Sequence, residues 1–255
     1  MRLTNFLNEL NKYKEIDHNI LIDLLKKKCK NNLKSLINGK VTIYRGDDNF
    51  RKVGDIVLIS PGDRISANTS NEYTILFSDV LSSWKKYPKR NHSIICSTDY
   101  KYADTYGTSY IIIPFDNTNV GICPSYDFWE SFNNAFREIL DFKSDSFLLT
   151  TLNDFLSYIK FENNINILEK KFSEIYSKYK NSNYYGIFML DKLKSAFYDK
   201  SIYDVLNKYF SPEYNGFILK SNLLGLPEKR EIWFDNQAIA LHSEYFDLDH
   251  FRDYI

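Results

Sequence analysis

The strongest constraint in this sequence is the order of its patterns, because a long helical run separates two groups of β-favouring segments. From about residue 125 to 210, apolar residues recur at steps of three and four with only short Asn, Ser and Gly breaks, a spacing typical of amphipathic helices. β-favouring segments stand on both sides of this run, at 41–45, 93–98, 109–115, 216–220 and 231–241. If these segments share one core, the fold is α+β with a mostly antiparallel sheet and an inserted helical block.

The N-terminal part predicts helices that precede the sheet. Apolar residues fall at helical spacing between residues 3 and 38, and the pattern stops at Asn38-Gly39, a helix-ending signal. A second helical pattern covers 71–87 and ends before Pro88. The segment 55–60 fits either a strand or a loop, and the Asp235-Asn236 break inside 231–241 is compatible with a tight hairpin turn.

Length and composition favour a folded protein. The chain has 255 residues, 44% hydrophobic and 26% charged, which is the composition of ordinary globular proteins and excludes a disordered or fibrous chain. It contains no internal repeat and no low-complexity linker. We therefore expect a single domain over 1–255 with the helical insertion at about 125–210.

Charge and cysteine content narrow the class of partner. The formal net charge is +0, so the strongly basic field that non-specific DNA binding needs is missing. Neither a signal peptide nor a membrane span of ~20 apolar residues is present in the pattern. The three cysteines, Cys29, Cys96 and Cys123, form no CxxC pair, and the four histidines are scattered, which predicts neither disulfides nor a metal site. We expect a cytoplasmic protein, the cytoplasm of a host cell included.

Three short strings stand in an order that suggests chemistry. Tyr44-Arg45-Gly46 ends the first expected strand, Ser97-Thr98 ends the buried segment 93–98, and Glu228-Lys-Arg-Glu231 leads into the last one. Each string alone has an ordinary explanation, as a surface-paired arginine, a helix cap or an exposed glutamate. Their order and context strengthen the joint case. The chain also retains only eight arginines among abundant Lys, Asn, Tyr and Phe, which makes each arginine more informative.

In this order the strings resemble the Arg-Ser-Glu class of mono-ADP-ribosyltransferases, whose toxin-like members place helices first, then an aromatic-Arg strand, a Ser-Thr-Ser strand and a loop before a catalytic Glu. The resemblance covers about residues 1–120 and 215–241. It implies an ADP-ribosyltransferase-like fold with NAD as co-substrate and a macromolecular acceptor, a protein in the first instance. The residues that it implies are Glu231 for catalysis and Arg45, Gly46, Ser97 and Thr98 for NAD binding.

The chemistry of NAD explains why these residue types fit. An arginine supplies a planar, always charged fork of donors for phosphate or ribose oxygens, and Gly46 would allow a ligand to approach the backbone closely. A hydroxyl at a strand end can hold that fork in place. A carboxylate can accept the ribose 2′-OH and stabilise the positive charge that develops as nicotinamide leaves.

The sequence also departs from the family pattern. The third residue of the Ser-Thr-Ser string is Asp99, and Lys229 stands where members that modify arginine or asparagine carry Glu or Gln. Glu228 therefore remains a rival for the catalytic role, and the acceptor residue type stays open. His92 could be placed in the His-Tyr-Glu branch of the same superfamily, but the position of Arg45 fits better. Cys96 lies in an apolar segment, which favours a buried structural thiol.

The leading hypothesis is therefore a mono-ADP-ribosyltransferase that cleaves the nicotinamide glycosidic bond of NAD. Two alternatives remain: a non-enzymatic effector or virus-encoded interaction protein with a transferase-like fold, and an NAD glycohydrolase that uses water as acceptor. The enzymatic hypotheses require Arg45, Ser97 and Glu231 to converge on one cleft. A fold that places the side chains of Arg45 and Glu231 on opposite faces of the sheet would argue against them.

Overall fold

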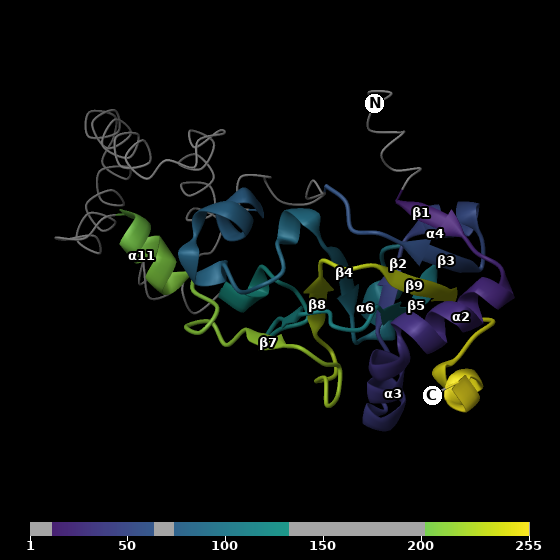
Figure 1. Ribbon diagram of the computed structural model, residues 1–255. Helices are drawn as coiled ribbons and strands as arrows, with labels where there is room; N and C mark the ends of the chain where they lie inside the picture. The colour runs from purple at the N-terminus through teal and green to yellow at the C-terminus, as the bar shows by residue number, and fades with distance from the viewer. Residues whose placement is uncertain (1–11, 64–73, 133–201, 255) are drawn as a thin grey trace. The chain divides into compact units, whose positions relative to one another are not determined.

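The computed structural model describes residues 12–63, 74–132 and 202–254 (Figure 1). The chain divides into two compact units. The first consists of Met1–Arg64, Tyr87–Phe128 and Ile218–Ile255, and the second of Ile65–Lys86 and Trp129–Phe217. Two segments that are distant in sequence thus make up the second unit, and three make up the first.

The first unit is built on a nine-stranded sheet with the order β1-β3-β9-β5-β2-β4-β8-β6-β7. Every pairing in it is antiparallel, so the α+β fold with an antiparallel core is confirmed. The strands are β1 (Tyr13–Glu15), β2 (Tyr44–Gly46), β3 (Ile56–Ile59), β4 (Ile94–Ser97), β5 (Ser109–Pro114), β6 (Val120–Ile122), β7 (Ile218–Lys220), β8 (Glu231–Phe234) and β9 (Ala238–His242).

The expected hairpin within 231–241 is wrong. Strand β8 pairs with β4 and β6, whereas β9 pairs with β3 and β5. Three strands, β5, β2 and β4, lie between β9 and β8 in the sheet order, so the Asp235-Asn236 break carries the chain across the sheet. A two-residue break fits a hairpin locally, but the buried apolar face of each strand selects a different neighbour.

Part of the N-terminal segment that was expected to be helical is a strand, and the expectation for residues 3–11 lies outside the described residues. Residues Tyr13–Glu15 form the edge strand β1, paired with β3, and helix α2 (His18–Lys28) starts after Asp17, whose side chain accepts a hydrogen bond from the N–H of Ile20 at 2.9 Å. Tyr13 fits the helical spacing by coincidence. Apolar residues that lie four positions apart share one face of a strand as well as one face of a helix, so a short stretch does not distinguish the two. Strand β6 was also not expected.

Among the described residues of the first unit, four α-helices accompany the sheet. Helix α3 (Lys30–Gly39) follows α2 and buries Leu33, Leu36 and Ile37, and the amide of Asn32 donates hydrogen bonds to the carbonyls of Pro114 and Phe115 at the end of β5. The other two helices are short, α4 (Asp48–Val53) and α6 (Tyr100–Asp104). Each begins at an aspartate, Asp47 or Asp99, that accepts the N–H two residues on.

Helix α6 lies so close to β2 that only glycine fits at the end of that strand. A Cβ atom at Gly46 would collide with the carbonyl of Ala103 in α6. Gly46 was expected to let a ligand approach the backbone, but the group that lies against it is the protein's own helix α6. The residue type is therefore explained by packing.

In the second unit the described residues form a cluster of aromatic rings around the π-helical turn η1 (Leu76–Val80), the 3₁₀ turns η2 (Ser82–Trp84) and η4 (Glu130–Phe132), and α11 (Ile202–Tyr209). The rings of Phe77 and Phe132 stack at 4.9 Å, and the indole N–H of Trp84 donates to the carbonyl of Phe210 at 2.7 Å. Most of the expected helical block at 125–210 lies outside the described residues.

We predict that the first unit folds without Trp129–Phe217, the larger segment of the second unit. Replacing 129–217 with a Gly/Ser linker of ten residues should preserve one cooperative unfolding transition, because all nine strands lie outside this range. The linker must join Phe128 to Ile218. Ile218 lies beside its register partner Ile122, and the six residues from Ile122 to Phe128 span at most ~21 Å, which ten linker residues can bridge. Chemical denaturation monitored by circular dichroism measures the transition.

The matched control inserts the same linker between Phe128 and Trp129 without any deletion. A shortened chain with no cooperative transition, beside a control that unfolds normally, would show that the sheet needs the segment Trp129–Phe217.

Candidate functional site

The three strings of the sequence analysis lie on three adjacent strands, β2, β4 and β8. Ser97 is the register partner of Tyr44 on one side and of Glu231 on the other. Segments separated by more than 130 residues in the sequence therefore meet in one row across the sheet. This is the part of the expected site that the fold brings together.

The same register separates the two charged residues. Direct partners in an antiparallel sheet point to the same face, and successive residues point to opposite faces. Tyr44, Ser97 and Glu231 therefore share one face, and Arg45 points to the other. The side-chain contacts agree, because the Tyr44 ring packs against Tyr100 of α6, whereas the Arg45 guanidinium lies 5.9 Å from the Phe50 ring of α4.

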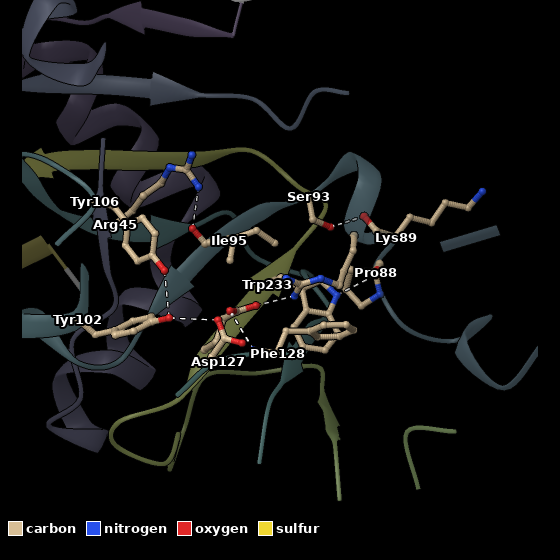
Figure 2. Close-up of polar contacts among 12 residues, drawn as sticks. Arg45, Pro88, Lys89, Ser93, Ile95, Tyr102, Tyr106, Asp127, Phe128 and Trp233 are labelled. Carbon is tan, nitrogen blue, oxygen red and sulfur yellow. Dashed lines mark hydrogen bonds and ion pairs between the residues drawn. The ribbon is translucent and has the colours of Figure 1, made fainter. Parts of the chain in front are cut away.

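Two nitrogens of the Arg45 guanidinium donate hydrogen bonds within the protein. Its Nη1 donates to the carbonyl of Ile95 in β4 at 2.7 Å, as Figure 2 shows, and its Nη2 donates to the Asp47 carboxylate at 3.1 Å. Tyr13 of the edge strand β1 donates its hydroxyl to the same carboxylate at 3.0 Å. Arg45 thus ties β2 to β4, and through Asp47 it is linked to β1.

Two pKa shifts describe this cluster. Burial is the largest influence on the Asp47 carboxyl and acts to raise its pKa, but Arg45 and the N–H of Asn49 outweigh it and hold the pKa below the ordinary value. Burial raises the pKa of Tyr13 to about 12, so its phenol stays protonated. At neutral pH the cluster therefore consists of the Arg45–Asp47 ion pair and the neutral Tyr13 hydroxyl, which donates to Asp47.

Glu231 is held in a second buried cluster, formed by Arg90, Phe128, Glu231 and Trp233. The Arg90 guanidinium donates to Glu231 Oε1 at 2.6 Å, and the backbone N–H of Phe128 donates to Oε2 at 3.2 Å. The two charged side chains are only 6% and 8% exposed. The guanidinium also lies 3.8 Å from the Phe128 ring and 5.3 Å from the Trp233 ring, which closes the cluster with aromatic surface.

Further hydrogen bonds hold this cluster in position (Figure 2). The Trp233 indole N–H donates to the carbonyl of Pro88 at 2.8 Å, which fixes the segment that precedes Arg90. On the other side the hydroxyl of Tyr102, in α6, donates to Asp127 at 3.1 Å and lies 3.0 Å from the Tyr106 hydroxyl. This chain attaches the segment before Phe128 to α6. The Arg90–Glu231 pair is therefore built into the packing of three segments.

The hydroxyls of Ser97 and Thr98 have local partners. Ser97 Oγ accepts the N–H of Asp99 at 3.0 Å, just before α6. Thr98 Oγ1 donates to the carbonyl of Pro227 at 2.8 Å and accepts the N–H of Arg230 at 2.9 Å. Thr98 thus fixes the loop that leads into β8, and neither hydroxyl contacts Arg45 as expected for a shared NAD site.

The rival candidates show no catalytic environment. Glu228 is exposed in the loop before β8. His92 is half-exposed, with Nδ1 3.4 Å from Asp63 Oδ1. Cys96 is buried, and burial raises the pKa of its thiol to about 12, which leaves it a protonated structural side chain.

Arg90 is the residue that sequence reasoning missed. It follows Pro88 in a string of charged and polar residues, Lys89 to His92, which is the pattern of an exposed loop. The signal that was available is the scarcity of arginine in this chain, which makes each one informative. That signal names a candidate but cannot name its partner, because Glu231 lies 141 positions away.

No protein-family model, curated protein or solved structure matches this chain. Among the described residues, no group of three or more His, Cys, Asp or Glu side chains is placed to hold a metal ion. No helix in that part of the chain is long and apolar enough to cross a membrane.

We predict that Glu231→Gln destabilises the protein by about 3–5 kcal/mol, because it leaves the buried charge of Arg90 without a counter-charge. Denaturant unfolding measures the change. The matched control Glu228→Gln removes the exposed acid three positions earlier and should stay within about 0.5 kcal/mol of wild type. Adding Arg90→Gln to Glu231→Gln should recover part of the loss, and equal stability of wild type and Glu231→Gln would contradict the assignment.

A second prediction concerns acid stability. Because the folded state holds the Asp47 pKa below its unfolded value of about 3.9, the carboxylate contributes stability above that pH and loses it as pH falls through the folded pKa. Asp47→Asn should therefore lower stability at pH 7 and flatten its decline below about pH 4. Arg45→Gln should have the same effect, since Arg45 holds the charge. Unfolding curves at several pH values test this, and an unaltered decline in both variants would refute it.

Proposed function

We propose that this chain is a non-enzymatic interaction protein whose sheet is transferase-like. The observation that carries this proposal is the separation of Arg45 and Glu231 on opposite faces of the sheet, each in an internal ion pair. The resemblance in motif order remains its link to the ADP-ribosyltransferases. In this reading the three strings are retained for structure.

Transfer chemistry needs both groups on one NAD molecule. The guanidinium would hold the pyrophosphate or ribose while the carboxylate stabilises the developing ribose cation, and such groups act only within contact distance of one bound substrate. Here the sheet itself stands between the Arg45 and Glu231 side chains. A single ligand cannot contact both side chains in this arrangement.

The state of Glu231 adds an energetic argument. The Glu231 side chain is only 8% exposed, so a ribose hydroxyl could reach its carboxylate only if a covering group such as Arg90 or Phe128 moved away. Releasing Arg90 leaves a charge 94% buried without a partner, which costs several kcal/mol. NAD binding would have to offset that cost.

The mono-ADP-ribosyltransferase hypothesis is kept as the second candidate because of one specific observation. The three strings fall on adjacent strands with Ser97 directly opposite Glu231, as a shared site would require. In that case Arg45, Ser97 and Thr98 bind NAD, Glu231 acts on the ribose, and a macromolecule accepts ADP-ribose. The NAD glycohydrolase hypothesis uses the same site, with water as the acceptor of ADP-ribose.

Incubation of the purified protein with labelled NAD and a cell lysate tests the proposal. We expect no labelled macromolecule, no free ADP-ribose and no nicotinamide release above a blank without protein. Label on a macromolecule would establish the transferase, and free ADP-ribose alone would establish the glycohydrolase. Either result overturns the proposal.

Variants separate the two candidates further. If the protein does cleave NAD, Glu231→Gln should reduce turnover on the order of 10²–10³-fold with little change in NAD affinity, and Arg45→Lys should weaken both, because it loses the planar fork. Glu228→Gln is the control with the milder effect. If the proposal holds, Glu231→Gln and Arg45→Lys change only the unfolding free energy, and isothermal titration with NAD shows no binding to any of the four proteins.

A further inference from the structure

Helices α2 and α3, which follow each other directly along the chain (Figure 1), carry a stretch of sequence without acidic residues. The chain has 33 Asp and Glu among 255 residues, yet none stands in residues 24–46. The lysines of this stretch are Lys26, Lys27, Lys28, Lys30, Lys34 and Lys40. All of them are exposed. A chain whose net charge is +0 therefore has one strongly basic surface, residues 26–40, which we call the lysine surface.

Most of these lysines have no counter-charge. Lys27 pairs with Asp23 at 2.6 Å, and the ammonium of Lys26 lies 5.3 Å from the centre of the Tyr254 ring. The other four take part in no ion pair within the described part of the chain. Like charges that are crowded together repel each other, so the lysine surface attracts an anionic partner.

Acids close to the lysine surface do not neutralise it. Asp116 accepts the first backbone N–H groups of α3, at 2.8 and 3.1 Å. The 3₁₀ segment η5 (Leu248–Tyr254) packs on α2 and α3, and its Asp249 pairs with Arg252 at 2.8 Å. Among the described residues, no carboxylate of η5 forms an ion pair with a lysine of this surface. Its charge is therefore available to a partner.

Helix stability explains only part of the lysine surface. Lys26, Lys27 and Lys28 lie in the last turn of α2, where a positive charge interacts favourably with the helix dipole. Lys30 is the first residue of α3, where a positive charge is unfavourable. It also stands one turn from Lys34, so the two ammonium groups repel each other. The stability of α3 does not account for these two lysines.

The other exposed residues of the lysine surface indicate which anion it fits. Every exposed residue in 26–40 is a lysine or an asparagine, the asparagines being Asn31 and Asn38. A helix that lies in a membrane interface uses exposed apolar side chains, and a site for unpaired bases uses exposed aromatic rings. Exposed side chains of neither kind occur in 26–40. Lysine and asparagine are typical donors to the phosphate and sugar oxygens of a duplex.

We propose that the lysine surface binds the sugar–phosphate backbone of a nucleic-acid duplex. The ammonium groups replace cations that are condensed on the phosphates, and the asparagine amides donate to backbone oxygens. Lys30 and Lys40 lie ~15 Å apart along α3, a length that spans about four phosphates of one strand. Such contacts do not read bases, so the affinity is independent of sequence. The inference goes beyond the proposed function and does not depend on it, because an interaction protein and an NAD-cleaving enzyme could both carry this surface.

Fluorescence anisotropy of a labelled DNA duplex of mixed sequence, titrated with the full chain, tests the proposal. We expect binding at about 50 mM salt that weakens as salt rises, with a slope of log K against log salt of about −4 to −5, because each neutralised phosphate contributes about −0.9. The same titration is made with an RNA duplex, with one separated DNA strand and with phosphatidylserine vesicles. The duplex that binds more tightly identifies DNA or RNA as the natural source. No binding of either duplex at about 100 μM protein, tighter binding of the single strand, or binding of the vesicles alone would overturn the proposal.

Variants locate the surface. Lys30→Gln combined with Lys34→Gln should weaken duplex binding at about 50 mM salt by at least about tenfold and reduce the salt slope by about 2. Lys52→Gln combined with Lys101→Gln is the matched control, because it removes two exposed lysines on α4 and α6, and its salt slope should equal that of wild type. The unfolding midpoint of the first double variant should not fall, so that lost binding is not lost folding. An equal loss of affinity and slope in both double variants would refute the assignment to α2 and α3.

Discussion

The arrangement of charged groups in this protein depends on the register of β2, β4 and β8. Once Tyr44, Ser97 and Glu231 lie in one row, the alternation of side chains along a strand assigns every neighbour to a face. Arg45 falls beside Cys96 and Phe50, and Trp233 falls beside Glu231 on the face that holds Arg90. A register shift of one residue would exchange these faces and leave both buried charges without their partners. The two ion pairs therefore also help to specify the register.

The two ion pairs differ in their surroundings. Arg45 bonds a backbone carbonyl and a carboxylate that also accepts from Tyr13, so its cluster is a polar network with several partners. Arg90 is packed against Phe128 and Trp233 and, among the described residues, pairs with the carboxylate of Glu231 alone. Removing Asp47 leaves Arg45 with the Ile95 carbonyl, whereas Arg90 without Glu231 would face two aromatic rings. The free-energy cost of breaking the pair is therefore higher in the second cluster.

The sequence predicted the class of fold and the positions of most strands. It could do so because the spacing of apolar residues along a strand or a helix follows from which of its faces is buried. It placed β4 and β5 within one or two residues of their bounds. It failed where local patterns are ambiguous, as at Tyr13, and where the partner of a strand is chosen by tertiary packing, as at Asp235-Asn236. For the candidate site it found Arg45, Ser97 and Glu231 on adjacent strands, but motif order carries no information on which face each side chain occupies. Arg90 was missed because its partner is distant in sequence.

The two ion pairs also decide what the sheet can offer to an anionic ligand. Arg45, the residue that the resemblance assigns to NAD, is paired with Asp47, and Arg90 is paired with Glu231. Each guanidinium therefore has a counter-charge within the protein, and a pyrophosphate would have to compete with that carboxylate for it. The separation of Arg45 and Glu231 on two faces and the pairing of their charges thus both act against a nucleotide that contacts both residues.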